Sequence, residues 1–272
     1  MRKNTNTGII WIDTVDSTND EAKRRIHSLN HLSVVAAYKQ TAGRGQRGNT
    51  WSSESGKNLT FSIIIKYGKD GYADLIPSKQ FIISKIAAIS VASLLSKYGI
   101  TASIKWPNDI YVNDKKIAGI LIEHTFHKDL LAYSIIGIGI NVNQLTFDSN
   151  LYNPTSLLLE SHIVREFDLN SLLEEFVNLF KEIIEQKPFS ELDSIYLSKL
   201  WRLNTKAKFI DYTALPGGFL NIPILPNLTN VPMSTQFCGI IRGVSDIGEL
   251  IVENEESSNI RAFGFKEIGF II

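Results

Sequence analysis

The chain has almost no cysteine, since Cys238 is the only one among its 272 residues. A single thiol cannot form a disulfide within the chain, and metal sites built on several thiolates are excluded. The five histidines also lack the spacing of metal ligands. These absences fit a reducing compartment, and we expect a cytoplasmic protein.

The chain also lacks an excess of charge of either sign, because its 28 basic residues are matched by 28 acidic ones. A neutral chain has none of the overall attraction expected of a dedicated nucleic-acid or membrane-surface binder, so any bound anion must be held by a local cluster. The N-terminus lacks the apolar stretch of a signal peptide, and no apolar run of about 18 residues spans a bilayer. We therefore expect no association with membranes.

Apolar residues make up 44% of the chain, enough for a sizeable core in one large domain or two unequal ones. Alternating apolar residues predict strands, and apolar residues three and four apart predict helices. The expected strands are residues 9–15, 33–40, 59–67, 103–106 and 130–143, with a hairpin over 109–123 that turns at Asn113 and Asp114, and the expected helices are 16–29, 77–98, 169–187 and 190–201. Because strands follow one another across short turns and the helices are grouped, we predict an α+β fold, a mixed or antiparallel sheet with helices on one face.

The composition changes beyond Asn204. Prolines and glycines cluster in LPGGFLNIPILPNLTNVP, residues 215–232, and residues 237–253 have the pattern of a hairpin in a small β barrel. We predict two domains, residues 1–203 and residues 204–272.

The segment QTAGRGQRGNTW at residues 40–51 places three glycines at the spacing of a dinucleotide-binding turn. That interpretation fails because the residues after Gly48 have no helical periodicity, and a helix N-terminus is what binds the pyrophosphate. An RNA-binding Arg-Gly tract is disfavoured by the short loop and the neutral chain. Two interpretations stay open: a solvated surface loop, or a loop that closes over an anion, with Arg44 and Arg47 neutralising its oxygens.

A second polar cluster lies in KWPNDIYVNDKKIAGILIE, residues 105–123. Strand alternation predicts that Lys116 shares a face with Ala118 and Ile120, small or apolar residues suited to the floor of a pocket. Asp109 follows a Pro-Asn turn, where an aspartate is either a ligand for magnesium or an ordinary turn residue.

The strand end GIGINVN, residues 137–143, carries glycines at alternate positions, where a ligand or another backbone can approach closely. Its Asn141 is suited to bind a base or a phosphate. The polar stretch from residue 144 to residue 156 has weak periodicity, which is typical of a second loop.

Four ordered motifs, which are DSTN at 16–19, the glycine loop, residues 105–123 and GIGINVN, resemble the biotin protein ligases. The C-terminal GVSDIGELIV is similar to the SH3-like domain of that family. The resemblance implies the fold of the class II aminoacyl-tRNA synthetases and biotin-lipoate ligases. It also implies ATP-dependent attachment of biotin to a lysine of a biotin carboxyl carrier protein domain, through biotinyl-5′-AMP and with Mg²⁺.

The resemblance also implies roles for particular residues. Biotin-binding roles fall on Ser17, Thr18, Asn19, Gln40, Gly43, Arg44, Gly45, Lys116 and Gly119; nucleotide-binding roles fall on Arg47, Trp51, Lys105, Asn108 and Asn141; catalytic roles fall on Lys116, Arg44 and Arg47; and Asp109 is the magnesium candidate.

The chain departs from the family pattern in two places. Commoner forms of the glycine loop carry a basic residue at the position of Gln46, and often another at Asn49, so we expect a weaker hold on the adenylate. The catalytic pattern begins by Trp11, so we expect a monofunctional ligase without the DNA-binding domain of some members, and no DNA binding. A homodimer is compatible with the family. The alternatives are a lipoate or octanoate ligase or transferase of the same fold, and a sensor that binds biotin or a nucleotide without turnover.

Overall fold

Two units make up the chain in the computed structural model, which describes residues 8–69, 71–215 and 232–271. They are Met1–Tyr196 and Leu197–Ile272, and each is described by itself. The division falls inside α5 (Phe189–Ser198), earlier in the chain than residue 203, where the composition changes.

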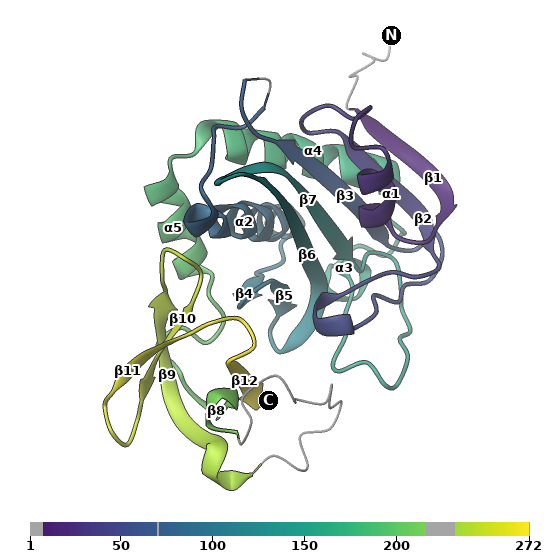
Figure 1. The fold of residues 1–272 in the computed structure, drawn as a ribbon. Coiled ribbons are helices and arrows are strands. Elements are labelled where there is room, and N and C mark those ends of the chain that lie inside the picture. Colours follow the sequence, from purple (N-terminus) through teal and green to yellow (C-terminus); the bar gives the residue numbers. More distant parts are fainter. Residues whose placement is uncertain (1–7, 70, 216–231, 272) are drawn as a thin grey trace. The chain divides into compact units, whose positions relative to one another are not determined.

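A seven-stranded mixed sheet forms the frame of the N-terminal unit (Figure 1). In spatial order its strands are β1 (Ile9–Val15), β2 (Val34–Gln40), β3 (Leu59–Lys66), β7 (Leu130–Ile140), β6 (Lys115–His127), β5 (Asp109–Val112) and β4 (Ser103–Lys105). Only β1 and β2 pair in parallel, because a helix connects them, and the other neighbouring strands of this sheet are antiparallel. The predicted α+β fold with a mixed sheet is confirmed.

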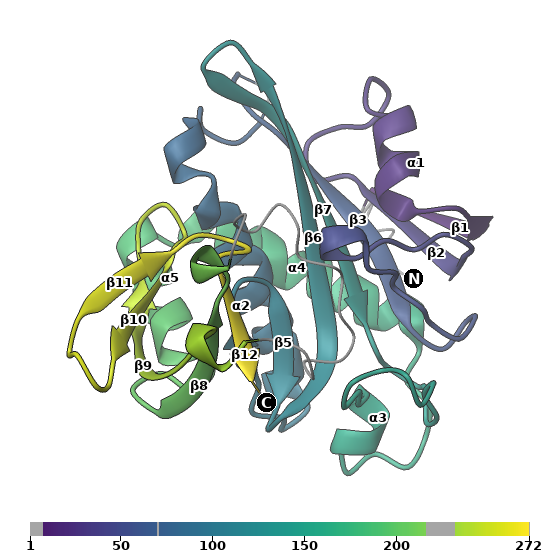
Figure 2. The same ribbon diagram turned by 60° about the horizontal axis from the view of Figure 1, so that its bottom comes forward.

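The two long helices, α2 (Phe81–Lys97) and α4 (Leu169–Gln186), cover one face of the sheet. Phe61 of β3 meets Phe176 of α4 with ring centroids 5.1 Å apart. The short helix α1 (Thr18–Arg24) packs on the opposite face, where Ala22 shares an apolar cluster with Ile64 of the same strand (Figures 1 and 2). Residues three apart in a strand point to opposite faces. The long helices therefore lie on one face as predicted, and α1 is an addition on the other.

Helix α2 is buried on almost every side, because it lies between α4 and the strands β4 to β6. Contrary to the sequence analysis, Pro77–Lys97 is long and apolar enough to cross a membrane by length and composition alone. Most of this segment is buried inside the unit, as in the core helix of a water-soluble fold, and the buried Lys85 is neutralised by Asp193 at 2.6 Å.

The predicted elements match the structure apart from their ends. The hairpin over 109–123 turns at Asn113, which has a φ of 55°, a conformation that asparagine tolerates. Helix α1 ends at Arg24 rather than at residue 29, because the amides of Ile26 and Ser28 donate to carbonyls three residues earlier as the chain turns toward β2. A single 3-10 turn precedes α2, which begins at Phe81 rather than at residue 77. The remaining helix, α3 (Leu157–Glu160), is one turn long.

The C-terminal unit contains a five-stranded antiparallel sheet, consistent with the SH3-like domain expected from the sequence. Its strands in spatial order are β11 (Ile260–Phe263), β10 (Leu250–Asn254), β9 (Gln236–Val244), β8 (Lys206–Asp211) and β12 (Ile268–Ile271). The pairing of β9 with β10 confirms the predicted hairpin. Of the proline- and glycine-rich segment, residues 216–231 lie outside the described residues.

Candidate functional site

Two glycines on neighbouring strands form a bare strip on the α1 face of the N-terminal sheet. In the register of the strands, Gly119 of β6 stands directly opposite Gly139 of β7, and Thr60 of β3 and Asp109 of β5 extend the row on either side. Lys105 of β4 pairs with Asp109 and completes it. Residues directly opposite one another in antiparallel strands point to the same face, so the two glycines leave a gap between polar neighbours.

The indole of Trp51 lies in this gap. A Cβ atom at Gly139 would stand 2.2 Å from Cε2 of Trp51, and one at Gly119 would stand 3.1 Å from its Cζ3. The glycines are needed because the ring lies against the bare backbone, so the close approach predicted at GIGINVN is made by a side chain of the glycine loop. The indole Nε1 is buried and makes no hydrogen bond within the described part of the chain. Trp51 thus forms a wall over the strip, with a donor left for another partner.

Lys116 points to the same side of the sheet as this strip, which corrects the face predicted from strand alternation. Lys116 stands opposite Tyr111, and Ala118 stands opposite the preceding residue of β5, so Ile117 is an extra residue in a β-bulge. The bulge reverses the alternation, and a Cβ atom at Gly119 would lie 3.5 Å from the Nζ atom of Lys116. Lys116 therefore shares its side with Gly119 rather than with Ala118 and Ile120.

Hydrogen bonds fix the backbone of Lys116, and an ion pair fixes its ammonium group. The amide N–H of Lys116 donates to the carbonyl of Asn153 (2.8 Å), and its carbonyl accepts from the amide of Thr155 (2.9 Å). Its Nζ pairs with Asp109 Oδ1 at 2.8 Å and lies 5.9 Å from the centre of a Trp51 ring. Asn141, predicted to bind the nucleotide, donates its side-chain amide to the carbonyl of Thr155 (2.9 Å), the residue whose own amide donates to Lys116.

A buried polar network lies farther along the same face. The backbone N–H and the hydroxyl of Thr18 lie 2.8 and 3.2 Å from Oε1 of Gln40. Ser62 Oγ lies 2.8 Å from the Thr18 hydroxyl and 2.6 Å from Oδ1 of Asn19. The Asn19 amide donates to Oε2 of Glu123 (2.7 Å) and covers Gly137, where a Cβ atom would lie 2.4 Å from its Oδ1. The network offers donors and acceptors in fixed directions, which suits a compact polar ring.

Ser62 and Glu123 are the members of this network that the sequence analysis gave no role. The only sequence signal for Ser62 is a hydroxyl within an otherwise apolar buried strand. Glu123 lies at the end of the lysine-bearing motif, but its partners come from α1 and the glycine loop, and no spacing rule predicts those contacts.

Ser17 is the buried N-cap residue of α1, and its hydroxyl makes no capping hydrogen bond. It precedes Thr18 and Asn19, so three of the predicted biotin-binding residues begin one helix on the α1 face of the sheet.

The glycine loop is a tight hairpin that folds back on the start of α1. The amide of Trp51 donates to the carbonyl of Gly43 (2.9 Å), and the amide of Gly45 donates to the carbonyl of Asn49 (2.7 Å). A Cβ atom at Gly43 would lie 2.4 Å from the Trp51 carbonyl oxygen, which explains a glycine at that position. The side chain of Arg47 lies outside what the structure describes, so its predicted role is untested.

The guanidinium of Arg44 is balanced by two carboxylates, which no pattern in the sequence predicts. Its Nη2 atom lies 2.8 Å from Asp20 Oδ1 and 2.9 Å from Glu123 Oε2. The Arg44 side chain keeps 41% of its surface exposed, so a bound anion can still reach it.

Two of the predicted nucleotide-binding residues have structural partners on β5 and β6. Asn108 donates its side-chain amide to the carbonyl of Ile120. Lys105 donates to the hydroxyl of Tyr111 at 3.1 Å, and its Nζ lies 4.8 Å from the centre of the Tyr111 ring. Burial, together with the negative charge of Asp109, raises the pKa of the Tyr111 hydroxyl, so it stays protonated at neutral pH.

Asp109 is a single carboxylate in this region. Over residues 8–69, 71–215 and 232–271, no group of three or more histidine, cysteine, aspartate or glutamate side chains converges as a metal site. Magnesium bound with a nucleotide usually takes only one or two protein carboxylates and completes its shell with phosphates and water. The donor set therefore fits magnesium that arrives with a nucleotide and gives no support to a resident metal.

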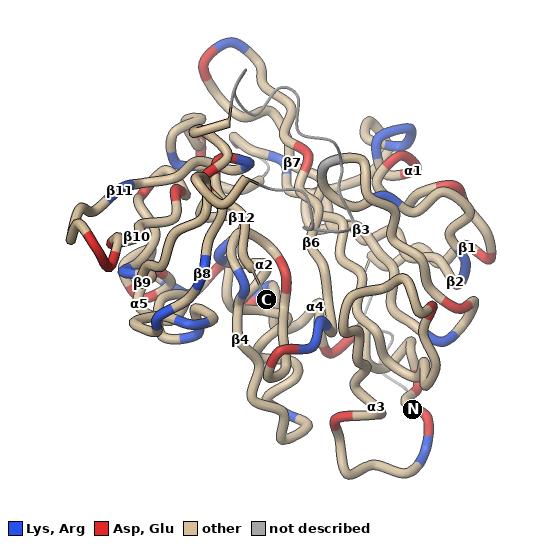
Figure 3. Tube along the Cα trace, turned by 90° about the horizontal axis from the view of Figure 1, so that it is seen from below, with Lys and Arg blue, Asp and Glu red and all other residues tan. Residues whose placement is uncertain are grey.

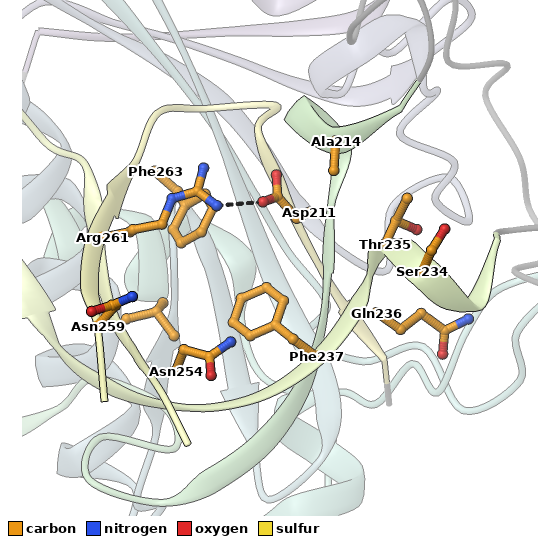
Figure 4. A pocket seen from close by; sticks show the side chains of 11 residues that line it. Asp211, Ala214, Ser234, Thr235, Gln236, Phe237, Asn254, Asn259, Arg261 and Phe263 are labelled. Carbon is orange, nitrogen blue, oxygen red and sulfur yellow. Dashed lines mark hydrogen bonds and ion pairs between the residues drawn. The ribbon is translucent and has the colours of Figure 1, made fainter. Parts of the chain in front are cut away.

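The C-terminal unit has a cavity of about 150 Å³ between the aromatic rings of Phe237 and Phe263 (Figure 4). Arg261 at its edge pairs with Asp211 at 2.5 Å. The cavity is smaller than the roughly 300 Å³ at which small-molecule sites begin, so it is a weaker candidate than the site on the N-terminal sheet.

Over the residues that the structure describes, basic and acidic residues are interspersed on both units (Figure 3). Arg44 and Lys116 thus supply local positive charge in a neutral protein, each beside a carboxylate. The site combines a polar network, to which Arg44 is bonded through Glu123, with a second cation, Lys116, beside Gly119, an arrangement that suits a ligand with a polar ring and an anionic group.

Comparisons with known proteins agree with this arrangement. Residues 11–141 match the model of the Biotin/lipoate A/B protein ligase family. The Bifunctional ligase/repressor BirA of Escherichia coli is 28% identical over 90% of this chain and 68% of its own length. Biotin--protein ligase 2 of Arabidopsis thaliana is 30% identical over 69% of this chain and 57% of its own length.

Among solved structures, the biotin protein ligase from Aquifex aeolicus in complex with biotin and ATP is similar with a TM-score of 0.70. It is 26% identical in sequence, and the match covers 96% of this chain and 97% of that one. This similarity extends over both units, beyond the region matched by the family model.

Proposed function

The chain belongs to the biotin protein ligase family, and on that premise we propose that it activates biotin with ATP and attaches it to a lysine of a biotin carboxyl carrier protein. In the first step a carboxylate oxygen of biotin attacks the α-phosphorus of ATP. The bond from that phosphorus to the bridging oxygen breaks, and the products are biotinyl-5′-AMP and pyrophosphate. In the second step the neutral lysine amine of the carrier attacks the acyl carbon, AMP leaves, and the nitrogen loses a proton.

The observation that carries this proposal is the placement of two cations, Arg44 and Lys116, on the same face of the sheet as the polar network. An anionic carboxylate that approaches a triphosphate is repelled unless positive charge is already in place. Lys116 and Arg44 supply that charge, and each pairs with a carboxylate within 3 Å. Charge fixed before the reaction stabilises the developing negative charge without reorganisation of solvent.

The polar network suits the ureido ring of biotin, which carries both N–H donors and a carbonyl acceptor. Gln40, Thr18 and Asn19 present hydroxyl and amide groups near one another on the α1 face. Ser17, the buried N-cap residue, adds a hydroxyl that is not used for capping. The indole of Trp51, which covers Gly119 and Gly139, would offer an apolar surface to the chain between the ureido ring and the carboxylate.

We place the magnesium ion that accompanies ATP at Asp109, where it would offset the charge of the phosphates. Asp109 pairs with Lys116 in the structure. Exchange of that partner would leave Lys116 Nζ free to face the reacting carboxylate and phosphate.

The test is release of pyrophosphate from ATP and Mg²⁺, with and without biotin, by wild type, Lys116→Ala and Lys115→Ala. Lys115 is the matched control because it is the neighbouring lysine of the same strand, its side chain is 51% exposed, and it pairs with Glu160. We expect biotin-dependent release that falls at least 100-fold in Lys116→Ala and stays within twofold in Lys115→Ala.

Addition of a biotin carrier domain should convert a single burst of pyrophosphate into continuous turnover. Binding of biotin without pyrophosphate release would indicate a sensor instead of an enzyme. Release that depends on lipoate or octanoate rather than on biotin would assign the chain to the other branch of the family.

A further inference from the structure

We infer that Glu123 is a positioning residue that, together with Asp20, fixes the direction of the Arg44 guanidinium and leaves its Nε and Nη1 hydrogens available to the reacting anion. This inference rests on the proposed function, because it concerns how one cation of that site is oriented. Glu123 acts through Arg44 and is given no contact with the substrates.

Strand β6 places Glu123 on the α1 face of the sheet, where the other site residues lie. Along β6 it follows Gly119 and Leu121 at alternate positions, beyond the bulge, so the three residues point to the same side. One oxygen, Oε2, accepts from both the Asn19 amide (2.7 Å) and Arg44 Nη2 (2.9 Å). A single carboxylate on a rigid central strand therefore ties the polar network on α1 to the cation on the glycine loop.

The contacts of Arg44 are confined to one corner of its guanidinium. Both carboxylates, Asp20 and Glu123, accept from the same nitrogen, Nη2. Within the described ranges, the Nε and Nη1 atoms of Arg44 make no hydrogen bond to the protein. An arginine held in this way keeps its Nε and Nη1 hydrogens for a carboxylate or a phosphate.

Two negative groups beside an anion site carry an electrostatic cost. Both side chains are partly exposed, 37% for Glu123 and 38% for Asp20, so water screens much of this repulsion. A misdirected guanidinium costs more, because a shift of about 1 Å in a reacting group lowers the rate on the order of 100-fold. Positioning should therefore outweigh repulsion, and removal of the Glu123 charge should slow the reaction.

A double-mutant cycle tests this inference in the full chain. The variants are Glu123→Gln, Arg44→Ala and the pair, measured by biotin-dependent exchange of pyrophosphate into ATP. Glutamine keeps an oxygen that accepts from Asn19 and removes only the charge. We expect kcat/KM for biotin to fall about tenfold in Glu123→Gln in the wild-type background and to change less than twofold when Arg44 is already alanine.

Asp20→Asn is a second, independent variant of the same arrangement, and a smaller loss that also vanishes beside Arg44→Ala is expected. Glu166→Gln is the control for loss of one surface carboxylate, since Glu166 pairs with Lys57 away from the site residues named above. The thermal midpoint of Glu123→Gln should stay within about 3 °C of wild type, because the affected ion pair is partly exposed.

Three outcomes are informative. Additive losses in the cycle, with wild-type exchange intact, would overturn the positioning role and leave the ligase function standing. A gain of activity in Glu123→Gln would mean that repulsion dominates and would also overturn it. Absence of biotin-dependent exchange in the wild type would instead refute the function on which the inference rests.

Discussion

Replacement of Gly139 by alanine should disable the site with little effect on the fold. The new Cβ atom would stand 2.2 Å from Cε2, 2.5 Å from Cζ2 and 2.6 Å from Nε1 of Trp51, whereas ordinary carbon contacts begin near 3.4 Å. The backbone at Gly139 does not have a positive φ, so the strand itself accepts alanine. The indole must therefore move by more than 1 Å, and it carries the end of the glycine loop with it.

Gly139→Ala should lower the thermal stability slightly and the activity strongly. Overpacking of this kind costs about 1–3 kcal/mol, or roughly 2–4 °C in thermal midpoint for each kcal/mol in a unit of this size. Because Trp51 lies on a loop that can shift, the stability loss should be at the low end. The displaced loop carries Arg44, so biotin adenylation should fall on the order of 100-fold.

The measurement is the thermal midpoint together with biotin-dependent pyrophosphate exchange for Gly139→Ala, Trp51→Phe and the double variant. Phenylalanine is smaller, so the double variant should recover part of the activity lost in Gly139→Ala. Gly264→Ala is the control, since its nearest neighbours are the far end of the flexible Glu267 side chain. Activity of Gly139→Ala within twofold of wild type would show that the indole does not lie over β7 in solution.

Four further predictions concern the same unit. Ser62→Ala should weaken biotin binding by about 1–3 kcal/mol in calorimetry and leave ATP binding unchanged, because it removes a buried hydroxyl beside Asn19. Asp109→Asn should raise the Mg²⁺ concentration needed for half-maximal pyrophosphate release, and an unchanged Mg²⁺ dependence would argue against a magnesium role. Gln46→Arg should slow the dissociation of biotinyl-AMP, measured by chase with unlabelled adenylate, because it adds a cation to the glycine loop. Burial lowers the pKa of His124 to about 4 from 6.5, so the folded state binds fewer protons than the unfolded state between these values. Stability should therefore be complete above about pH 6.5 and decline as the pH falls toward 4, and His124→Gln should flatten that part of a denaturation profile measured against pH.

Helix and strand patterns in this sequence are local, and for that reason they could be predicted. Strand β3 is buried on both faces and is therefore a continuous apolar run, and α4 is buried on one face and therefore has apolar residues three and four apart. Each pattern can be read from the segment alone. Helix ends were less predictable, because the end of α1 at Arg24 depends on where the chain must turn to reach β2. The face of Lys116 was predicted wrongly for a similar reason. A β-bulge is a property of the pairing of two strands, and the residues of one strand do not reveal it.

The sequence by itself determined the class of the protein, because its motifs are short, ordered and local in the chain. It also predicted Lys116, Gly119, Ser17 and Thr18 as site residues, and it gave Ser62 no role. Only the tertiary structure decided how they meet. It placed Trp51 against Gly139, turned Lys116 toward Asp109, and gave Arg44 the carboxylates of Asp20 and Glu123. Those contacts join residues far apart in the chain through strand register and loop folding, and no local pattern contains that information.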